Sequence, residues 1–379
     1  MKIIYCIAGL YNSGGMERIL TSKVNYLIEH CNYNVIIITT DQKNRSIFYP
    51  LNEKVKHIDL ELNYTDDLKY SFFKRVFIYL KKQFKHKKLL KDILKKENPE
   101  IIVSLGNHET FFLPNIVNKN IKTIREHHFN KNFRLQEIPK NIFYKLKFIY
   151  DNFNEKKTVK KYNEFIVLTE EDRKQWNNNK MRVIYNFLDC IPRKNSNCKN
   201  KKIISVGRLE YQKGFDILID VWKKVDEKHS DWVLEIYGEG SLRKELQDKI
   251  DSLNLTDSLI LKGSEKNIQS KYLESSIYMM SSRYEGMPMV LLEAMSCGLP
   301  LVSFDCPCGP KDIIKDGENG FLVKFGNIEE MAKKINYLIE NEDKRIDMGK
   351  KAKELSYNYL KEKIMNQWKE LFENLSDRS

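Results

Sequence analysis

The 379-residue chain carries 65 Lys and Arg against 52 Asp and Glu, and 41% of its residues are hydrophobic. That hydrophobic share is enough to bury cores, which excludes wholesale disorder, and the length is typical of two domains. The seven cysteines are an odd number spread along the chain, and they predict reduced cytosolic thiols without a disulfide framework or a zinc site. The opening MKIIYCIAGLY is too short for a signal peptide, and no apolar run reaches the roughly 20 residues of a membrane-spanning helix.

The positive charge is concentrated in the first half of the chain. Residues 1–185 contain 34 Lys and Arg against 20 Asp and Glu, whereas the remainder contains 31 against 32. We therefore expect the first half to meet something anionic, with nucleic acid and a membrane surface as the two obvious candidates.

Short apolar runs alternate with helix-period segments in this half, which is the pattern of a parallel sheet covered by helices. The predicted strands are Ile3–Ala8, Asn34–Thr39, Ile101–Leu105, Lys122–Arg125, Phe165–Leu168 and a last short one around Val183–Tyr185. The polar and basic stretch DCIPRKNSNCKNKK, residues 189–202, then predicts an interdomain linker.

The segment at residues 69–96 departs from this pattern because it holds eleven Lys or Arg and one acid. Apolar residues recur in it at helical spacing, namely Phe73, Val76, Phe77, Leu80 and Phe84. A basic amphipathic helix of this kind suits the interface of an anionic membrane. The alternative is a surface helix whose apolar stripe packs on its own sheet and whose lysines are merely solvated. Since no nucleic-acid-binding module accompanies the charge, we expect no nucleic acid partner.

A second alternating set follows the linker. Its predicted strands are Ile203–Val206, Trp232–Tyr237, Leu259–Leu261, Ile277–Met280, Leu299–Ser303 and Gly320–Val323. The chain is therefore predicted to be an α/β protein with two Rossmann-like domains in tandem. We place the first domain at residues 1–188, the second at 189–356 and a final helix at 357–379.

The first motif is NSGGMER, residues 12–18, directly after the first strand. Gly14 and Gly15 allow a backbone to come close to a ligand, and the helix that follows offers free N–H groups to an anion. The GxGxxG spacing of dinucleotide-binding proteins is absent. By itself this motif is equally compatible with a tight turn.

The second motif is VGRLEYQKG, residues 206–214, at the same topological place in the second half. Gly207 permits a sharp turn, and Arg208 and Lys213 flank a loop that opens a helix. Two cations over a helix N-terminus form a good diphosphate clamp. The alternative is an ordinary pair of solvent-facing cations.

The third motif is SRYEGMPMVLLEAMSCG, residues 282–298. Pro288 suits a first helical turn and Gly298 suits the far end, so a short helix is expected between them. Glu285 then lies on the preceding loop and Glu293 lies inside the helix, which suits one ligand held at two points better than a glycosidase pair of carboxylates. The amides of Gly286 and Met287 are placed where a phosphate could be received.

Together these motifs resemble the family 4 retaining glycosyltransferases, whose E-x7-E motif corresponds to Glu285 and Glu293. The likeness covers nearly the whole chain, including YGEG at residues 237–240 and DGENGFLV at residues 316–323. The segment FDCPCGP, residues 304–310, is similar to members that extend bacterial surface polysaccharides. The resemblance implies the GT-B fold, in which two Rossmann-like domains face each other across a cleft and the last helix crosses back to the first domain.

The resemblance also implies the roles of the site residues. Arg208 and Lys213 would bind the donor diphosphate, Glu285 the donor sugar and Glu293 the ribose, while the Gly14–Gly15 pair would approach the diphosphate from the other domain. Members often place a histidine near the anomeric carbon at the position of REHH, residues 125–128. His127 and Glu285 are our catalytic candidates, and His128 is the second choice for the histidine. Without the resemblance, either histidine would be read as a hydrogen-bonded loop residue.

The function implied is transfer of a hexose or N-acetylhexosamine from a UDP-sugar, with retention, to a lipid-linked or envelope glycan in capsule, O-antigen, lipopolysaccharide or related synthesis. No Asp-x-Asp triplet occurs, so we expect no metal and no cofactor beyond the UDP-sugar donor. The expected partners are a glycan or polyprenyl-linked acceptor and an anionic membrane surface met by residues 69–96. The expected location is the cytoplasm, at the inner face of the membrane.

Two other functions remain open at this point. A nucleotide-sugar 2-epimerase shares the two-domain architecture but needs no acceptor site. A membrane-attached scaffold could keep the fold without turnover, although the presence of Arg208, Lys213, Glu285 and Glu293 argues against that loss.

Overall fold

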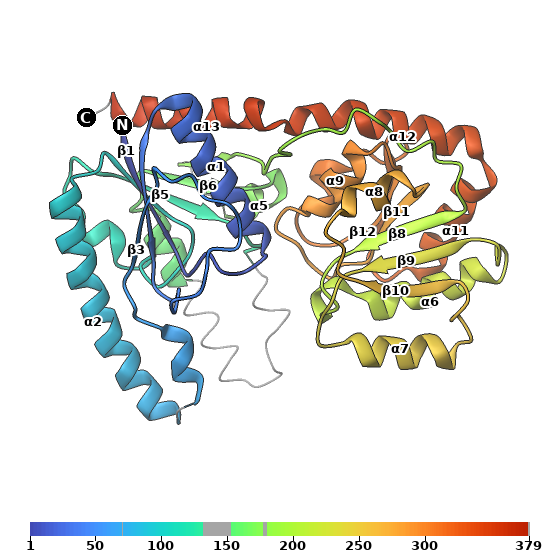
Figure 1. The fold of residues 1–379 in the computed structure, drawn as a ribbon, viewed down its shortest axis with the longest axis horizontal. Helices are drawn as coiled ribbons and strands as arrows, with labels where there is room; N and C mark the ends of the chain where they lie inside the picture. The colour runs from blue at the N-terminus through green and yellow to red at the C-terminus, as the bar shows by residue number, and fades with distance from the viewer. Residues whose placement is uncertain (70, 132–152, 177–179, 378–379) are drawn as a thin grey trace. The chain divides into compact units, whose positions relative to one another are not determined.

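The computed structural model describes residues 1–69, 71–131, 153–176 and 180–377, and the chain divides into two compact units. Unit 1 comprises Met1–Leu168, Arg173–Ile184 and Ile364–Ser379, and unit 2 comprises Thr169–Asp172 and Tyr185–Lys363. Each unit is built around one parallel sheet with helices packed on it, as Figure 1 shows. The predicted α/β class with two Rossmann-like domains is therefore confirmed.

The sheet of unit 1 has seven parallel strands in the order β3-β2-β1-β4-β5-β6-β7. Their bounds are β1 Lys2–Ile7, β2 Asn34–Thr39, β3 Lys56–Asp59, β4 Ile101–Ser104, β5 Lys122–His127, β6 Glu164–Val167 and β7 Met181–Val183. The sequence did not predict β3, and it ended β5 two residues early, at Arg125. The extension of β5 matters because it makes His127 the last residue of a strand, paired with Val167 of β6.

The helices of unit 1 cover both faces of this sheet. Those whose two ends both lie in the described residues are α1 Gly15–Cys31, α2 Phe72–Glu97, α5 Glu170–Trp176 and α13 Lys361–Ser376, with short 3-10 turns η1 Tyr64–Lys69 and η2 Leu113–Asn115. The helix α5 begins in the short segment assigned to unit 2, and α13 begins three residues before its unit 1 part. Leu90 and Leu94 of α2 pack in a core with Ile4, Ile36 and Ile102 of the central strands.

The sheet of unit 2 has six parallel strands in the order β10-β9-β8-β11-β12-β13. Their bounds are β8 Lys202–Val206, β9 Val233–Tyr237, β10 Leu259–Gly263, β11 Ile277–Met280, β12 Leu301–Asp305 and β13 Gly320–Lys324. All six lie where the sequence predicted them, within two residues at each end. The inner strands β11 and β12 are buried along nearly their whole length and appear in the sequence as continuous apolar runs, whereas the edge strand β10 alternates between buried and exposed residues.

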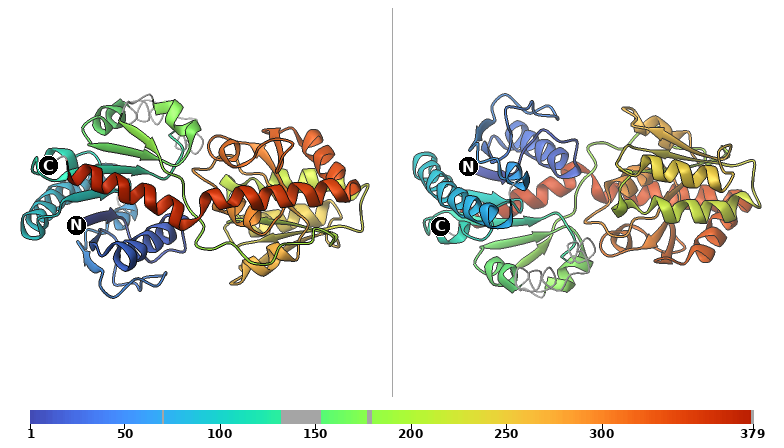
Figure 2. Two further views of the ribbon diagram at one scale, coloured as in Figure 1. Left: turned by 90° about the horizontal axis from the view of Figure 1, so that it is seen from above. Right: turned by 90° about the horizontal axis from the view of Figure 1, so that it is seen from below.

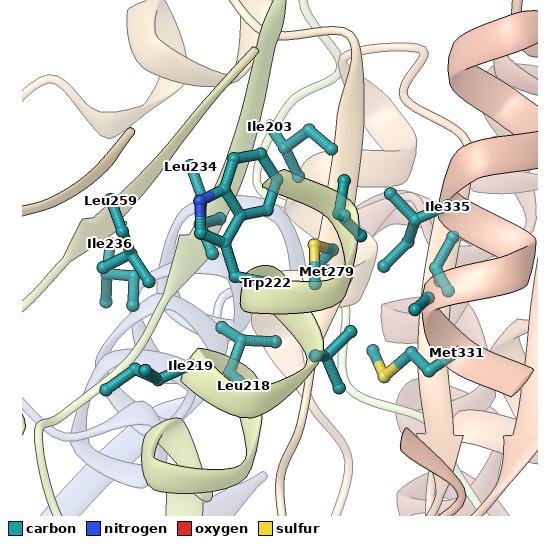
Figure 3. Close-up of a cluster of buried hydrophobic side chains, with 14 of the residues drawn as sticks. Ile203, Leu218, Ile219, Trp222, Leu234, Ile236, Leu259, Met279, Met331 and Ile335 are labelled. Atoms are coloured by element: carbon teal, nitrogen blue, oxygen red, sulfur yellow. The ribbon is translucent and has the colours of Figure 1, made fainter. Parts of the chain in front are cut away.

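The helices of unit 2 enclose a core centred on Trp222 (Figure 3). They are α6 Phe215–Asp226, α7 Arg243–Ser252, α8 Ile268–Leu273, α9 Met289–Ser296, α10 Pro310–Ile313, α11 Ile328–Glu340 and α12 Glu342–Ser356, with turns η3 Tyr211–Lys213 and η4 Tyr357–Tyr359. The fully buried Trp222 ring packs among residues of β8, β9 and α11, and its Nε1 donates a 3.1 Å hydrogen bond to Ser258 Oγ. That bond satisfies the polar atom of a large ring that is otherwise in an apolar core.

The last helix returns to unit 1, where α13 lies beside α1 (Figure 2). The Nζ atom of Lys23 on α1 lies 3.5 Å from the ring centroid of Trp368 on α13 and 2.8 Å from both carboxylate oxygens of Glu126 on β5. Both charged side chains are at most 2% exposed. One buried ammonium therefore joins α1, the central sheet and the returning helix.

Substituting Lys23 by Met should destabilise the protein by about 3–5 kcal/mol, because breaking a buried ion pair leaves an uncompensated charge. Burial alone would raise the pKa of Glu126, but Lys23 and His128 lower it from 4.5 to about 2. The stabilisation is therefore fully present above pH 4.5 and is lost as the pH falls towards 2, so the deficit of the variant should shrink in acid.

Urea denaturation of wild type and variant between pH 3 and 8 measures this difference. The control is Lys56→Met, whose pair with Glu97 leaves the lysine side chain 48% exposed and should contribute only about 0–1 kcal/mol. Equal destabilisation by the two substitutions would contradict the role of the buried pair.

Candidate active site

The candidate donor site lies in unit 2 where the loops after β8 and β11 emerge side by side. These neighbouring strands are the point at which the strand order reverses, since β8 continues outward to β9 and β11 continues outward to β12. Because all strands are parallel, both loops leave the same edge of the sheet, and ligands of open α/β sheets bind at this position. The loop after β8 carries Arg208 and Lys213, and the loop after β11 carries Glu285.

Glycines allow the loop after β8 to touch the loop after β9. A Cβ atom on Gly238 would lie 1.9 Å from the carbonyl oxygen of Gly207, and one on Gly240 would lie 2.4 Å from that of Leu209. Gly238 also has a φ of +142°, which other residues rarely adopt. The hydrogen bond from Gly207 N to Tyr237 O, 2.9 Å long, fixes this contact. The backbone of the YGEG segment therefore packs directly against the Gly207–Arg208 loop and fixes its position.

Hydrogen bonds also join the loop after β8 to the loop after β11. Arg283 N donates to Gln212 O at 2.7 Å, and Gln212 Nε2 donates to Tyr284 O at 3.0 Å. The Arg283 guanidinium binds both carboxylate oxygens of Asp216, at 2.8 and 2.6 Å, and donates to Tyr211 O at 2.8 Å. The hydrogen bond to Asp216 raises the pKa of Arg283, so this arginine is a permanent cation. Arg283 and Asp216 were not among the predicted site residues, because nothing in the motif says which way the Arg283 side chain points.

The two predicted cations differ in their surroundings. Arg208 is exposed, and its NH2 group contacts Gln212 Oε1 at 3.4 Å. Lys213, by contrast, does not face the solvent. Its side chain is only 15% exposed, it packs against Gly207, and its Nζ donates a 2.6 Å hydrogen bond to Glu285 Oε1. The turn η3 and the following Gly214, at φ +65°, direct Lys213 inward.

The residues after Glu285 lead into α9, which begins at Met289 with Pro288 at its N-cap. Glu293 lies in this helix, as expected, and its Oε2 accepts a 3.3 Å hydrogen bond from the Tyr272 hydroxyl. Gly286 is half-buried, whereas the Met287 side chain is buried and its sulfur accepts from Asn186 N at 3.1 Å. The Cys306–Pro310 loop packs against this segment, since a Cβ atom on Gly309 would meet Pro288 Cδ at 2.3 Å.

In unit 1, the Gly14–Gly15 pair lies at the N-terminus of α1, with Gly14 as the N-cap residue. A Cβ atom on Gly15 would meet nothing within 4 Å, so packing does not require glycine there. Space beside a helix N-terminus is what an approaching anion needs. On Gly14 a Cβ atom would meet Glu17 Oε2 at 2.3 Å.

The two histidines at the end of β5 point to opposite faces of the sheet, as the alternation of a strand requires. His127 is buried against Trp176, with ring centroids 5.2 Å apart, and its Nδ1 lies 3.4 Å from an Arg125 guanidinium nitrogen. His128 instead binds Glu126 Oε2 through Nε2, at 3.1 Å. His127 is therefore packed in a wall of aromatic rings, and His128 extends the ion pair of Lys23 and Glu126.

The family of this chain is decided by two comparisons with known proteins. The Glycosyl transferases group 1 domain matches residues 190–355, which hold Arg208, Lys213, Glu285 and Glu293. An uncharacterised glycosyltransferase of Haemophilus influenzae is 31% identical over 374 residues, covering 97% of this chain and 99% of that protein. The chain belongs to the Glycosyl transferases group 1 family.

Two further similarities extend over the whole glycosyltransferase chain. A relative in Campylobacter jejuni, named as an α-1,4-N-acetylgalactosaminyltransferase acting on an undecaprenyl-diphosphate-linked oligosaccharide, is 25% identical and covers 98% of both chains. The crystal structure of a Staphylococcus aureus TarM variant with fondaparinux, α-GlcNAc-glycerol and UDP has a TM-score of 0.77 at 20% identity, covering 98% of this chain and 99% of that one. The second likeness shows the fold alone, and it confirms the predicted GT-B architecture. Two other relatives, similar over about half of this chain, are named as an amylovoran biosynthesis glycosyltransferase of Erwinia amylovora and a poly(ribitol-phosphate) α-N-acetylglucosaminyltransferase of Staphylococcus aureus.

Proposed function

We propose that this glycosyltransferase moves a hexose or N-acetylhexosamine from a UDP-sugar to a lipid-linked acceptor of bacterial envelope glycan synthesis, with retention at the anomeric carbon. The observation that carries the donor half is the meeting of Arg208, Lys213 and Glu285 at the strand-order reversal of unit 2. Two cations and a carboxylate within one loop pair match a sugar diphosphate, which presents anionic oxygens next to hydroxyl groups.

Each predicted site residue then has a role in binding the donor. Arg208 and Lys213 neutralise the diphosphate, Glu285 accepts hydrogen bonds from sugar hydroxyls, and Glu293 accepts from the ribose. The backbone of Gly286 and Met287, just before α9, offers N–H groups to a phosphate oxygen. In unit 1, the open space beside Gly15 and Gly14 receives an anionic group at the N-terminus of α1.

The chemistry rests on stabilising the charge that develops on the departing diphosphate. Preorganised cations supply this stabilisation without a metal ion, and the departing phosphate itself takes the proton of the acceptor hydroxyl. His127 of unit 1 is the catalytic candidate, and Arg125 beside its Nδ1 favours the tautomer that carries the proton on Nε2.

Removing Arg208 should lower kcat/KM by a factor that corresponds to about 2–4 kcal/mol, because the lost guanidinium stabilises charge in the transition state. Stability should barely change, since Arg208 is exposed and bonded only weakly. Purified wild type and Arg208→Ala are compared by UDP release from a panel of UDP-sugars, with and without a polyprenyl-linked acceptor. The matched control is Arg193→Ala, an exposed arginine of the same unit.

Full turnover by Arg208→Ala would contradict the donor assignment. UDP release that requires no acceptor, with an epimerised sugar as the product, would instead identify a 2-epimerase.

The reaction should proceed in the presence of EDTA, because protein cations offset the diphosphate charge. The same UDP-release assay with and without chelator measures this. Complete loss of activity, restored by manganese or magnesium, would refute the metal-independent mechanism.

The acceptor half of the proposal is supported by α2, which divides into two halves of different character. Its C-terminal half packs on the sheet through Leu90 and Leu94. Its N-terminal half projects past the strands (Figure 1) and exposes Phe77, Leu80 and Phe84, which are 71%, 61% and 76% exposed. Phe77, Leu80 and Phe84 of the apolar stripe therefore do not pack on the protein's own sheet, which was the alternative explanation for them.

Lysines border this exposed stripe. Lys81, Lys85 and Lys88 are all exposed on the same helical turns as Phe77 and Phe84. Exposed aromatic residues ringed by basic ones suit the headgroup region of an anionic bilayer. Among the described residues, no helix is long and apolar enough to cross a bilayer. We therefore propose peripheral attachment at the inner face of the membrane, where the acceptor lipid would be met.

Binding to vesicles that contain anionic lipid should be strong at low salt and should weaken as salt rises, because each lysine near the surface contributes about 1 kcal/mol. Sedimentation is compared for wild type, a charge variant with Lys81, Lys85 and Lys88 changed to Glu, and an apolar variant with Phe77 and Phe84 changed to Ser. The charge variant should lose most binding at low salt, and the apolar variant should lose the part that survives high salt.

The matched control changes Lys91, Lys95 and Lys96 to Glu in the half of α2 that packs on the sheet. Lys91 lies ten residues, or about 15 Å of helix, beyond Lys81, and this distance exceeds the Debye length of about 8 Å. The control variant should therefore bind vesicles nearly as well as the wild type. Equal pelleting of all four proteins, or no pelleting of any, would show that the exposed half of α2 is only a solvated face.

A further inference from the structure

The ion pair between Lys213 and Glu285 joins the two sides of the donor site. The Nζ–Oε1 distance is 2.6 Å, and the two side chains are only 15% and 7% exposed. The cation assigned to the diphosphate is therefore bonded to the carboxylate assigned to the sugar.

Besides its bond to Lys213, Glu285 lies near buried groups that carry no charge to offset its own. Burial raises the pKa of the Cys306 thiol well above its usual value, and the nearby Glu285 charge adds to that effect, so the neighbouring thiol is neutral. The same two causes raise the pKa of the buried Tyr278 hydroxyl. Lys213 bonds directly to Glu285, a carboxylate that is largely withdrawn from water. If Lys213 moved away, the buried negative charge of Glu285 would be left uncompensated, which is costly.

We propose that the Lys213–Glu285 pair makes the site select an intact nucleotide-sugar over the free nucleoside diphosphate. This inference rests on the proposed function, because it requires a sugar diphosphate as the donor. A diphosphate that draws Lys213 to itself breaks the pair and leaves Glu285 buried and uncompensated. An intact donor binds Lys213 with its phosphates and Glu285 with its sugar hydroxyls, so both halves of the broken pair are satisfied.

The consequence for the reaction cycle is a penalty on the product. Once the sugar has left, the remaining UDP competes with Glu285 for Lys213 and has nothing to offer the carboxylate. Re-formation of the 2.6 Å pair then favours release of UDP. Arg208, which is exposed and outside the pair, keeps its contact with the diphosphate in both states and does not discriminate between them.

The test is a double-mutant cycle on nucleotide affinity. Isothermal titration calorimetry measures UDP and GDP binding to wild type, Glu285→Gln, Lys213→Met and the double variant. Because glutamine keeps the shape of Glu285 and removes its charge, Glu285→Gln should bind both nucleotides about tenfold more tightly than wild type. That gain should vanish in the Lys213→Met background, since no cation is left to release.

The matched control is Glu293→Gln, which removes the second carboxylate of the same motif and is bonded to Tyr272 instead of Lys213. It should not tighten UDP or GDP binding. Thermal melting of each variant establishes that it is folded before the titration.

Three outcomes overturn the proposal. If wild type binds UDP or GDP and Glu285→Gln binds no tighter, the pair does not oppose the diphosphate. If the gain is equally large in the Lys213→Met background, Glu285 acts by simple repulsion and not through Lys213. If neither nucleotide binds wild type or Glu285→Gln, the proposed donor class fails as well, which distinguishes that result from the first two.

Discussion

Two backbone segments of unit 2 approach so closely that one of them has no room for a side chain at the point of contact. Gly207 and Gly238 meet at the carboxyl edge of the sheet, where a single Cβ atom on Gly238 would lie 1.9 Å from a carbonyl oxygen. This contact sets the height of the loop after β8 and therefore the position of Arg208 and Lys213. The hydrogen bonds of Gln212 and Arg283 then hold the loop after β11 against it. The chemistry of the site depends on that packing before any charge is considered.

The fold could be predicted from the sequence largely because parallel strands are buried on both faces. Such strands read as continuous apolar runs, as the buried β11 does, whereas the edge strand β10 alternates between buried and exposed residues and was still recognised. The sequence did not predict β3, because this strand is not buried on both faces. It lies at the edge of its sheet, its four residues are half-buried or exposed, and Ile58 is the one aliphatic side chain among them. The predicted end of β5 at Arg125 was too early because the apolar run stops there. Glu126 and His127 are polar, yet they are buried because they contact residues of other elements.

The candidate site could be predicted only at the level of its loops. The sequence indicates that Arg208 and Lys213 follow one strand and Glu285 another, and the carboxyl ends of parallel strands share an edge, but the adjacency of β8 and β11 comes from the structure. Spacing does not indicate side-chain direction, so the inward turn of Lys213 onto Glu285 and the clasp of Arg283 on Asp216 could not be read from the motifs. Both depend on contacts between residues about 70 positions apart. The roles of the individual residues remain predictions.

The buried ion pairs of the two units differ in how many partners each charge has and in whether they are part of the candidate donor site. In unit 1, Lys23, Glu126, His128 and the Trp368 ring form a closed set in which each charge has several partners, so a permanent structural role follows. In unit 2, Lys213 and Glu285 lie beside the exposed Arg208, at the edge where loops open to ligands. A buried pair contributes little net stability when desolvation is counted against attraction. When such a pair lies next to a ligand-binding site, the cation and the carboxylate can each bond to a ligand in place of each other. The exchange costs little free energy, provided that the ligand bonds to both of them. A sugar diphosphate carries both kinds of group, and a nucleoside diphosphate carries one.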